Sequence, residues 1–66
     1  MTFETFIKEA AARAYAWQLQ TLEESNDYTR GYLKGYESAL INLIRAITND
    51  KGFMPYELKR QARRHI

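Results

Sequence analysis

Side chains suited to recognising a charged ligand gather near the C-terminal end of the sequence. Four cations occupy six consecutive positions, as Lys59, Arg60, Arg63 and Arg64. A helix dipole favours cations at its C-terminal end, but four of them so close together also repel one another, which favours an anionic counterpart. That counterpart is either the phosphate of a nucleic acid or an acidic protein surface. A solvated basic end without a partner is the third interpretation.

A helix-turn-helix motif is a poor explanation for these cations. The helix predicted around them is short, and Gln61 is its one polar uncharged side chain suited to reading bases. The helix predicted before it is too long for the usual first helix of that motif. We therefore interpret the four cations as a site for an anionic partner and not as a sequence-reading helix.

Residues for catalysis or metal binding are scarce. The sequence has no Cys and a single histidine, His65, next to its last residue. It also lacks a Gly-rich phosphate loop and a Ser–His–Asp set. Glu23, Glu24 and Asp27 cluster near a predicted turn, where carboxylates usually face solvent or cap a helix. The sequence therefore predicts no enzyme, no cofactor and no metal site.

Apolar residues recur at helical spacing along the whole sequence, so we expect an all-α fold in a single domain, residues 1–66. The predicted helices cover about 3–24, 28–48 and 55–65. The first two have similar lengths and a short connection, which favours an antiparallel hairpin followed by a short third helix.

The residues at the predicted helix ends fit these boundaries. Thr2 is suited to cap the first helix, and Asn26 or Asp27 the second. Asn49 or Gly52 can adopt the positive φ that ends the second helix, and Pro55 suits the first turn of the third. We expect Phe53 and Met54 to pack beneath the end of the hairpin.

The first helix carries more apolar surface than one packing partner needs. Its apolar residues form two neighbouring stripes, Phe3, Phe6, Ile7, Ala10, Ala14, Trp17 and Thr21, and then Ala11, Tyr15, Leu19 and Leu22. Together the stripes cover roughly 200° of the helix surface, whereas about 100° suffices for a helix of a simple hairpin. The excess predicts a second packing partner.

The second helix has a main apolar stripe of Tyr28, Tyr32, Tyr36, Ala39, Leu43 and Ile47, flanked by Leu33, Leu40 and Ile44. Beside it, Gly31 and Gly35 begin a groove of small residues. This groove receives either the first helix of the same chain or a helix of a partner. The tyrosines suit the boundary of a core, a protein interface or base stacking.

An interface with a second copy or with a partner protein follows from these features. We expect it to include Phe6, Trp17, Leu19, Leu22, Tyr28, Gly31, Tyr32, Gly35, Tyr36 and Ile41. Ile41 belongs to this set because it projects from the otherwise polar side of the second helix, where another chain would cover it.

Size and charge point to the same kind of protein. A chain of 66 residues without disulfides usually needs a supplement to its core, and oligomerisation or docking on a partner is left here. The net charge is +2, with five basic and seven acidic side chains in residues 1–50 and five basic and one acidic in 51–66. No apolar run is long enough to span a membrane and no secretory signal is recognisable, so we expect a cytoplasmic protein.

In size, lack of Cys, helical hairpin pattern and aromatic-rich surface, the chain resembles the small early proteins of bacteriophages. That class includes anti-CRISPR proteins and other inhibitors of host enzymes. The resemblance implies a stoichiometric binder without chemistry of its own, although the basic end departs from the acidic DNA mimics in the class.

Our expectation is thus a homodimeric helical bundle that binds a partner protein. A nucleic-acid-binding protein that uses its basic C-terminal helix is the first alternative, and a structural subunit of a larger particle is the second.

Overall fold

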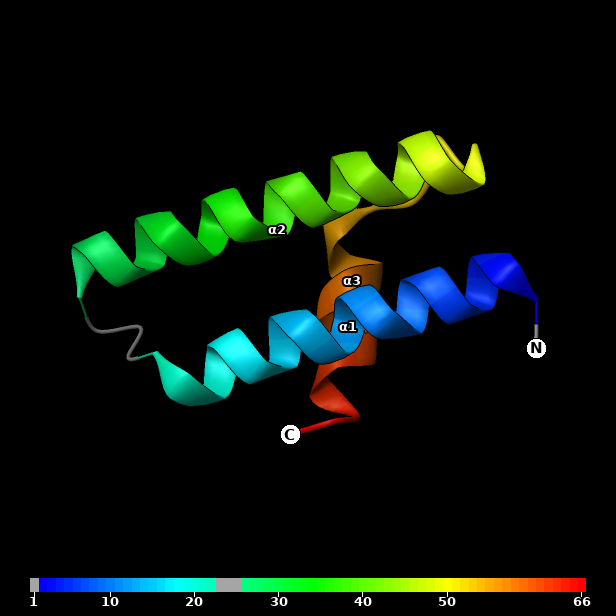
Figure 1. Cartoon of the computed structure of the whole chain (residues 1–66). Coiled ribbons are helices and arrows are strands. Elements are labelled where there is room, and N and C mark those ends of the chain that lie inside the picture. The colour runs from blue at the N-terminus through cyan, green and yellow to red at the C-terminus, as the bar shows by residue number, and fades with distance from the viewer. Residues whose placement is uncertain (1, 23–25) are drawn as a thin grey trace.

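The computed structural model describes residues 2–22 and 26–66. These residues form three α-helices and no strand: α1 (Phe3–Thr21), α2 (Asp27–Thr48) and α3 (Pro55–Arg63) (Figure 1). The all-α prediction is confirmed. α1 ends at Thr21 because Leu22 has an extended backbone, so the predicted end at residue 24 is wrong. Residues 23–25 lie outside the described residues.

Local sequence explains where each helix begins and ends. The hydroxyl of Thr2 accepts a hydrogen bond from the Thr5 amide at 3.1 Å, and the side chain of Asn26 accepts one from the Tyr28 amide at 2.7 Å. Asn49 ends α2 with a φ of 59°, so Asn49 and not Gly52 adopts the left-handed conformation. Pro55 occupies the first turn of α3, as predicted.

α1 and α2 lie side by side and run in opposite directions, forming one layer, and α3 crosses behind α1 in the view of Figure 1. The principal extents of the Cα trace are 36 × 20 × 14 Å. The molecule is therefore a slab, with the α1–α2 layer on one side and α3 on the other.

The core lies between this layer and α3. Its buried residues are Ala11, Ala12, Tyr15, Ala16, Ile41, Ile44, Phe53, Leu58 and Ala62. Because α1 contributes three alanines and α3 contributes one more, the backbones of these two helices can approach closely where they cross. Phe53, directly before α3, is among the largest fully buried side chains. Met54 is largely exposed, so the prediction that both pack beneath the hairpin is confirmed for Phe53 alone.

The position of α3 corrects the prediction for Ile41. We expected this side chain to project from a polar side of α2, but it is only 4% exposed and belongs to the core. α3 and the segment before it cover that side: Arg45 Nε donates to the Phe53 carbonyl at 2.9 Å, and Lys59 Nζ lies 3.4 Å from Glu37 Oε2. The "polar" side of α2 is therefore the side that receives α3.

Among the described residues, no helix combines the length and the apolar character that crossing a membrane requires.

Candidate interaction surfaces

The first candidate surface is apolar and lies on the side of the α1–α2 layer that faces away from α3. We call it the open face; its exposed residues are Phe3, Ala10, Trp17, Tyr28, Tyr32, Ala39, Leu43 and Ile47. This set contains most of the main stripe predicted for the second helix. The core instead uses the neighbouring stripe of α2, with Ile41 and Ile44.

Helix geometry places the open face opposite the core. At about 100° per residue, Tyr28, Tyr32 and Leu43 lie roughly 120–180° around α2 from Glu37, which contacts α3. Their exposed fractions are 82%, 46% and 52%. On α1, Phe3 and Trp17 lie roughly 140–180° from the buried Ala12, and each is 64% exposed. In Figure 1 this side of the layer is turned toward the viewer, in front of α3.

Near Tyr28 and Tyr32, α1 and α2 meet beside the open face. A shallow hollow of about 190 Å³ joins them, lined by Gln18 and Leu22 near the end of α1 and by Tyr28, Thr29 and Tyr32 of α2. The rings of Tyr32 and Tyr36 stack with their centroids 6.1 Å apart. Leu22, Tyr28, Tyr32 and Tyr36 thus lie together on or beside the open face.

Leu19, another residue of the predicted interface, lies elsewhere. It packs partly against the core and lines a cleft beside Lys59 and Arg63. Helical periodicity placed Leu19 with the interface because it does not reveal which flank of α1 faces α3. Phe6 is 56% exposed and lies about 20° around α1 from Trp17, at the edge of the open face, where it lines a hollow with Glu9, Ala10 and Arg13.

The two glycines of α2 do not receive α1. A Cβ atom at Gly31 or Gly35 would meet no other described atom within 4 Å. The interpretation in which α1 of the same chain fills this groove is therefore wrong. Gly35 lies next to the open face on α2, so a role in contacting a second chain stays a prediction. The close approach of helices occurs instead at the alanines of α1.

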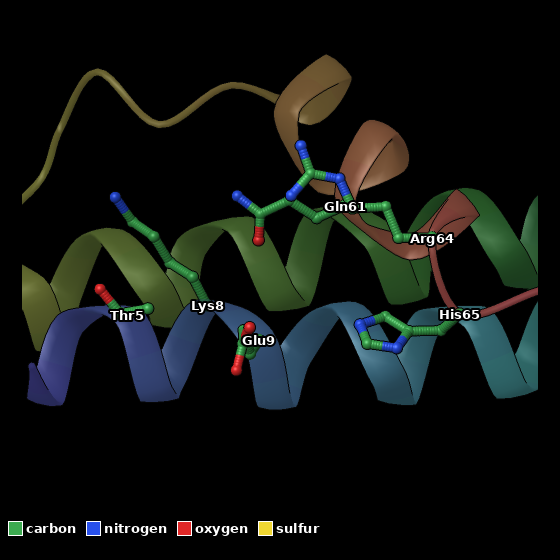
Figure 2. Close-up of a pocket in the computed structure, with 6 residues that line it drawn as sticks. All are labelled: Thr5, Lys8, Glu9, Gln61, Arg64 and His65. Carbon is green, nitrogen blue, oxygen red and sulfur yellow. The ribbon is translucent and has the colours of Figure 1, made fainter. Parts of the chain in front are cut away.

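The four cations in and directly after α3 do not form one site. Lys59 and Arg63 line a cleft on one side of α3. Arg64 lines a different hollow, between α1 and the end of α3 (Figure 2). Arg60 is exposed and lines neither. The packing of α3 through Leu58 and Ala62 therefore directs the cations to opposite flanks.

The hollow in Figure 2 has about 190 Å³ and mixed charge. Thr5, Lys8 and Glu9 of α1 lie on one side, and Gln61, Arg64 and His65 on the other. Lys8 is already engaged, because its Nζ donates to Glu4 at 2.9 Å and to Asp50 at 2.8 Å. With this lysine paired and Glu9 in the wall, the hollow offers little net attraction for an anion.

Lys8 instead connects α1 to the segment between α2 and α3. Besides its two ion pairs, its Nζ lies 5.0 Å from the centroid of the Phe53 ring. The hydrogen bond from Lys8 lowers the pKa of Asp50 below its ordinary value. The same bond, with that to Glu4, raises the pKa of Lys8. This group of side chains stabilises the fold and lies away from the open face.

Among residues 2–22 and 26–66, no group of three or more His, Cys, Asp or Glu side chains is arranged to hold a metal ion. Comparison with known proteins gave no matching family model, no matching curated protein and no matching solved structure. The resemblance to small phage proteins therefore stays a prediction about the type of protein.

Proposed function

We propose that this chain is a non-catalytic interaction protein that forms a homodimer through the open face and binds a partner protein stoichiometrically. The observation that carries the proposal is the exposure of Trp17, Tyr28, Tyr32 and Leu43 on one side of the antiparallel α1–α2 pair. Single exposed apolar side chains are ordinary on a protein surface, but several large ones on the same side of a helix pair are typical of an interaction site.

The area of the open face is close to what a stable dimer needs. If a full aromatic side chain offers about 200 Å², the exposed parts of Phe3, Trp17, Tyr28 and Tyr32 together offer roughly 500 Å². Leu43, Ile47 and the exposed alanines bring this toward the ~800 Å² that each partner buries in a standard interface. Two copies packed through this face would form a four-helix bundle with each α3 on the outside.

A second copy fits the open face better than a different protein for a further reason. A twofold interface uses the same patch on both subunits, so the patch must be complementary to itself. The large exposed side chains of the open face are aliphatic or aromatic, and its tyrosines combine a large apolar area with a polar tip. Neither feature creates repulsion between two identical faces.

The oligomeric state tests this proposal with a matched pair of variants. We expect a dimer at micromolar concentration in analytical ultracentrifugation. Tyr32→Glu should raise the dissociation constant at least ~100-fold, because it places an unpaired charge in the interface, at a cost of about 3 kcal/mol or more. Tyr56→Glu is the control, since Tyr56 is 62% exposed on α3, away from the open face.

A wild-type chain that stays monomeric at these concentrations would overturn the homodimer. Equal weakening by both variants would show that the open face is not the contact. A second experiment identifies the partner protein. Complexes are purified from the native source with the wild-type chain and with Tyr32→Glu as baits. Native mass spectrometry of the recovered complex separates a stoichiometric binder from a repeated subunit of a larger particle.

A further inference from the structure

A cleft between α3 and the α1–α2 layer brings together cations that are far apart in the sequence. Two hollows form it, of about 560 and 330 Å³, and they share Tyr15 and Lys59 in their linings. Arg30 and Lys34 of α2 line one hollow, and Arg63 of α3 lines the other. We call Arg30, Lys34, Lys59 and Arg63 the basic cleft.

Positive charge exceeds negative charge in this cleft. Glu37 is the one carboxylate in its lining, and its side chain is 12% exposed. Its Oε2 accepts a hydrogen bond from the Tyr15 hydroxyl at 2.9 Å and lies 3.4 Å from Lys59 Nζ. Glu37 thus holds Lys59 in place while Lys59 stays half exposed.

Two of the other three cations, Lys34 and Arg63, are available to a ligand. Arg30 pairs with Asp27 at the rim, where both side chains are largely exposed. Among the described residues, no carboxylate lies within ion-pair distance of Lys34 or Arg63. Cations on two walls of a concave surface reinforce one another's field, so the cleft attracts a polyanion more strongly than a flat patch would.

We propose that the basic cleft binds the phosphodiester backbone of a nucleic acid. Arg30 and Lys34 are four residues apart, as are Lys59 and Arg63, so each pair spans about 6 Å along its helix. The two pairs form rows of charge that can follow a backbone with one negative charge per nucleotide. This site lies on a different side of the molecule from the open face and does not rest on dimerisation.

An acidic protein fits the cleft less well. Protein interfaces depend on apolar anchor residues that fill desolvated pockets. Tyr15 and Leu33, which form the floor of the cleft, are each only 4% exposed, so the floor offers little surface to such an anchor. Ile66 is the exposed large apolar residue of the lining, at 65%. The other accessible groups are mainly the charged ends of long side chains, which suit phosphates.

The basic cleft contains a different set of cations from the set that the sequence pattern groups together. The pattern groups Lys59, Arg60, Arg63 and Arg64 on one helix. The basic cleft includes Lys59 and Arg63 of that group but not Arg60 or Arg64. It also includes Arg30 and Lys34 of α2. The two groupings can be separated by variants that remove the same number of charges.

Fluorescence anisotropy with labelled 20-nucleotide single-stranded DNA, single-stranded RNA and duplex DNA tests the cleft at low salt. The double variant Lys34→Ala/Arg63→Ala should weaken binding of the preferred probe at least ~10-fold and reduce its salt dependence by about two phosphate contacts. The control Arg60→Ala/Arg64→Ala should weaken binding by less than about 3-fold. Circular dichroism checks that both variants fold.

Three results would overturn the proposal. One is no binding of any of the three probes by the wild type at about 50 mM salt, where phosphate contacts are strong. Another is a control variant that loses as much affinity as the cleft variant. The last is poly-L-glutamate binding with the same affinity and the same sensitivity to the cleft variant, which would assign the cleft to an acidic protein. Tyr32→Glu should bind the short probes as well as the wild type, so this test is independent of the dimer.

Discussion

Among single residues, Lys8 makes the ion pair whose loss should matter most for the monomer. It joins α1 to Asp50, 42 positions later in the chain. The side chain of Lys8 is 17% exposed, so solvent screens this pair less than the exposed pair of Arg30 and Asp27. Because the pair connects segments distant in sequence, it stabilises the tertiary fold and not a single helix.

We predict that Asp50→Asn lowers the melting temperature at neutral pH. The pKa of Asp50 is lowered in the folded chain, mainly by the hydrogen bond from Lys8. A carboxylate with a lowered pKa stabilises the fold above its unfolded pKa and loses that contribution as the pH falls through the folded one. The difference between wild type and variant should therefore shrink once the pH falls below 3.8, the ordinary pKa of this group.

At alkaline pH the contribution of Lys8 to stability changes in the opposite direction. The pKa of Lys8 is raised above 10.5, so its contribution is complete below that pH and is lost only as the pH rises through the folded pKa. Glu4→Gln, which removes the other and more exposed partner of Lys8, serves as the control and should have the smaller effect. Thermal melts at a series of pH values measure both variants, and a pH-independent Asp50→Asn effect would contradict the assignment.

At the scale of the helices, α1 and α3 pack closely where they cross. Ala12, Ala16 and Ala62 are almost completely buried there. Small side chains permit the short distance between the helices, and any larger side chain must push α3 away or distort its neighbours. Displacing α3 would also disturb Phe53 and the walls of the basic cleft.

Ala12→Leu should therefore destabilise the protein by about 1–3 kcal/mol through overpacking. Arg13→Leu introduces the same side chain on the same helix at an exposed position outside the open face and should change the free energy of unfolding by no more than about 0.5 kcal/mol. Urea denaturation followed by circular dichroism compares the two. Equal stability of the variants would mean that α1 and α3 do not pack closely.

For the whole molecule, the slab shape separates two kinds of surface. The open face lies on one side of the α1–α2 layer, and α3 lies on the other. In the proposed dimer the layers meet, so apolar surface is buried at the centre while both basic clefts stay accessible. In the alternative dimer, the two α3 helices would meet at the centre and the α1–α2 layers would lie outside. This arrangement would bury four exposed cations per chain and is electrostatically unfavourable.

Spin labels can distinguish these two arrangements, because the chain has no Cys and single-cysteine variants carry one label each. Asn42→Cys places the label on an exposed position beside the open face, and Tyr56→Cys places it on α3. Helices packed in a bundle lie about 10 Å apart. The distance between labels in the dimer should therefore be shorter at position 42 than at position 56, and the reverse order would contradict the proposed dimer.

The sequence by itself determined the helices and most of their ends. Asn26, Asn49 and Pro55 act through the backbone within a few residues of themselves, so their roles can be read from the neighbouring sequence. Periodicity also located the apolar stripes of both long helices. Periodicity could not show which stripe of α2 forms the core, because α2 carries apolar residues around more than half of its surface.

Tertiary structure decided that question through α3. The burial of Phe53 and Leu58 places α3 across one flank of the α1–α2 layer, which covers Ile41 and leaves Leu43 exposed. The same packing brings Lys59 to Arg30 and Lys34 in one hollow, and Arg63 lines the hollow that shares Tyr15 and Lys59 with it. The pattern within one helix contains no information about the direction from which another helix approaches, so both the open face and the basic cleft depend on contacts between distant parts of the chain.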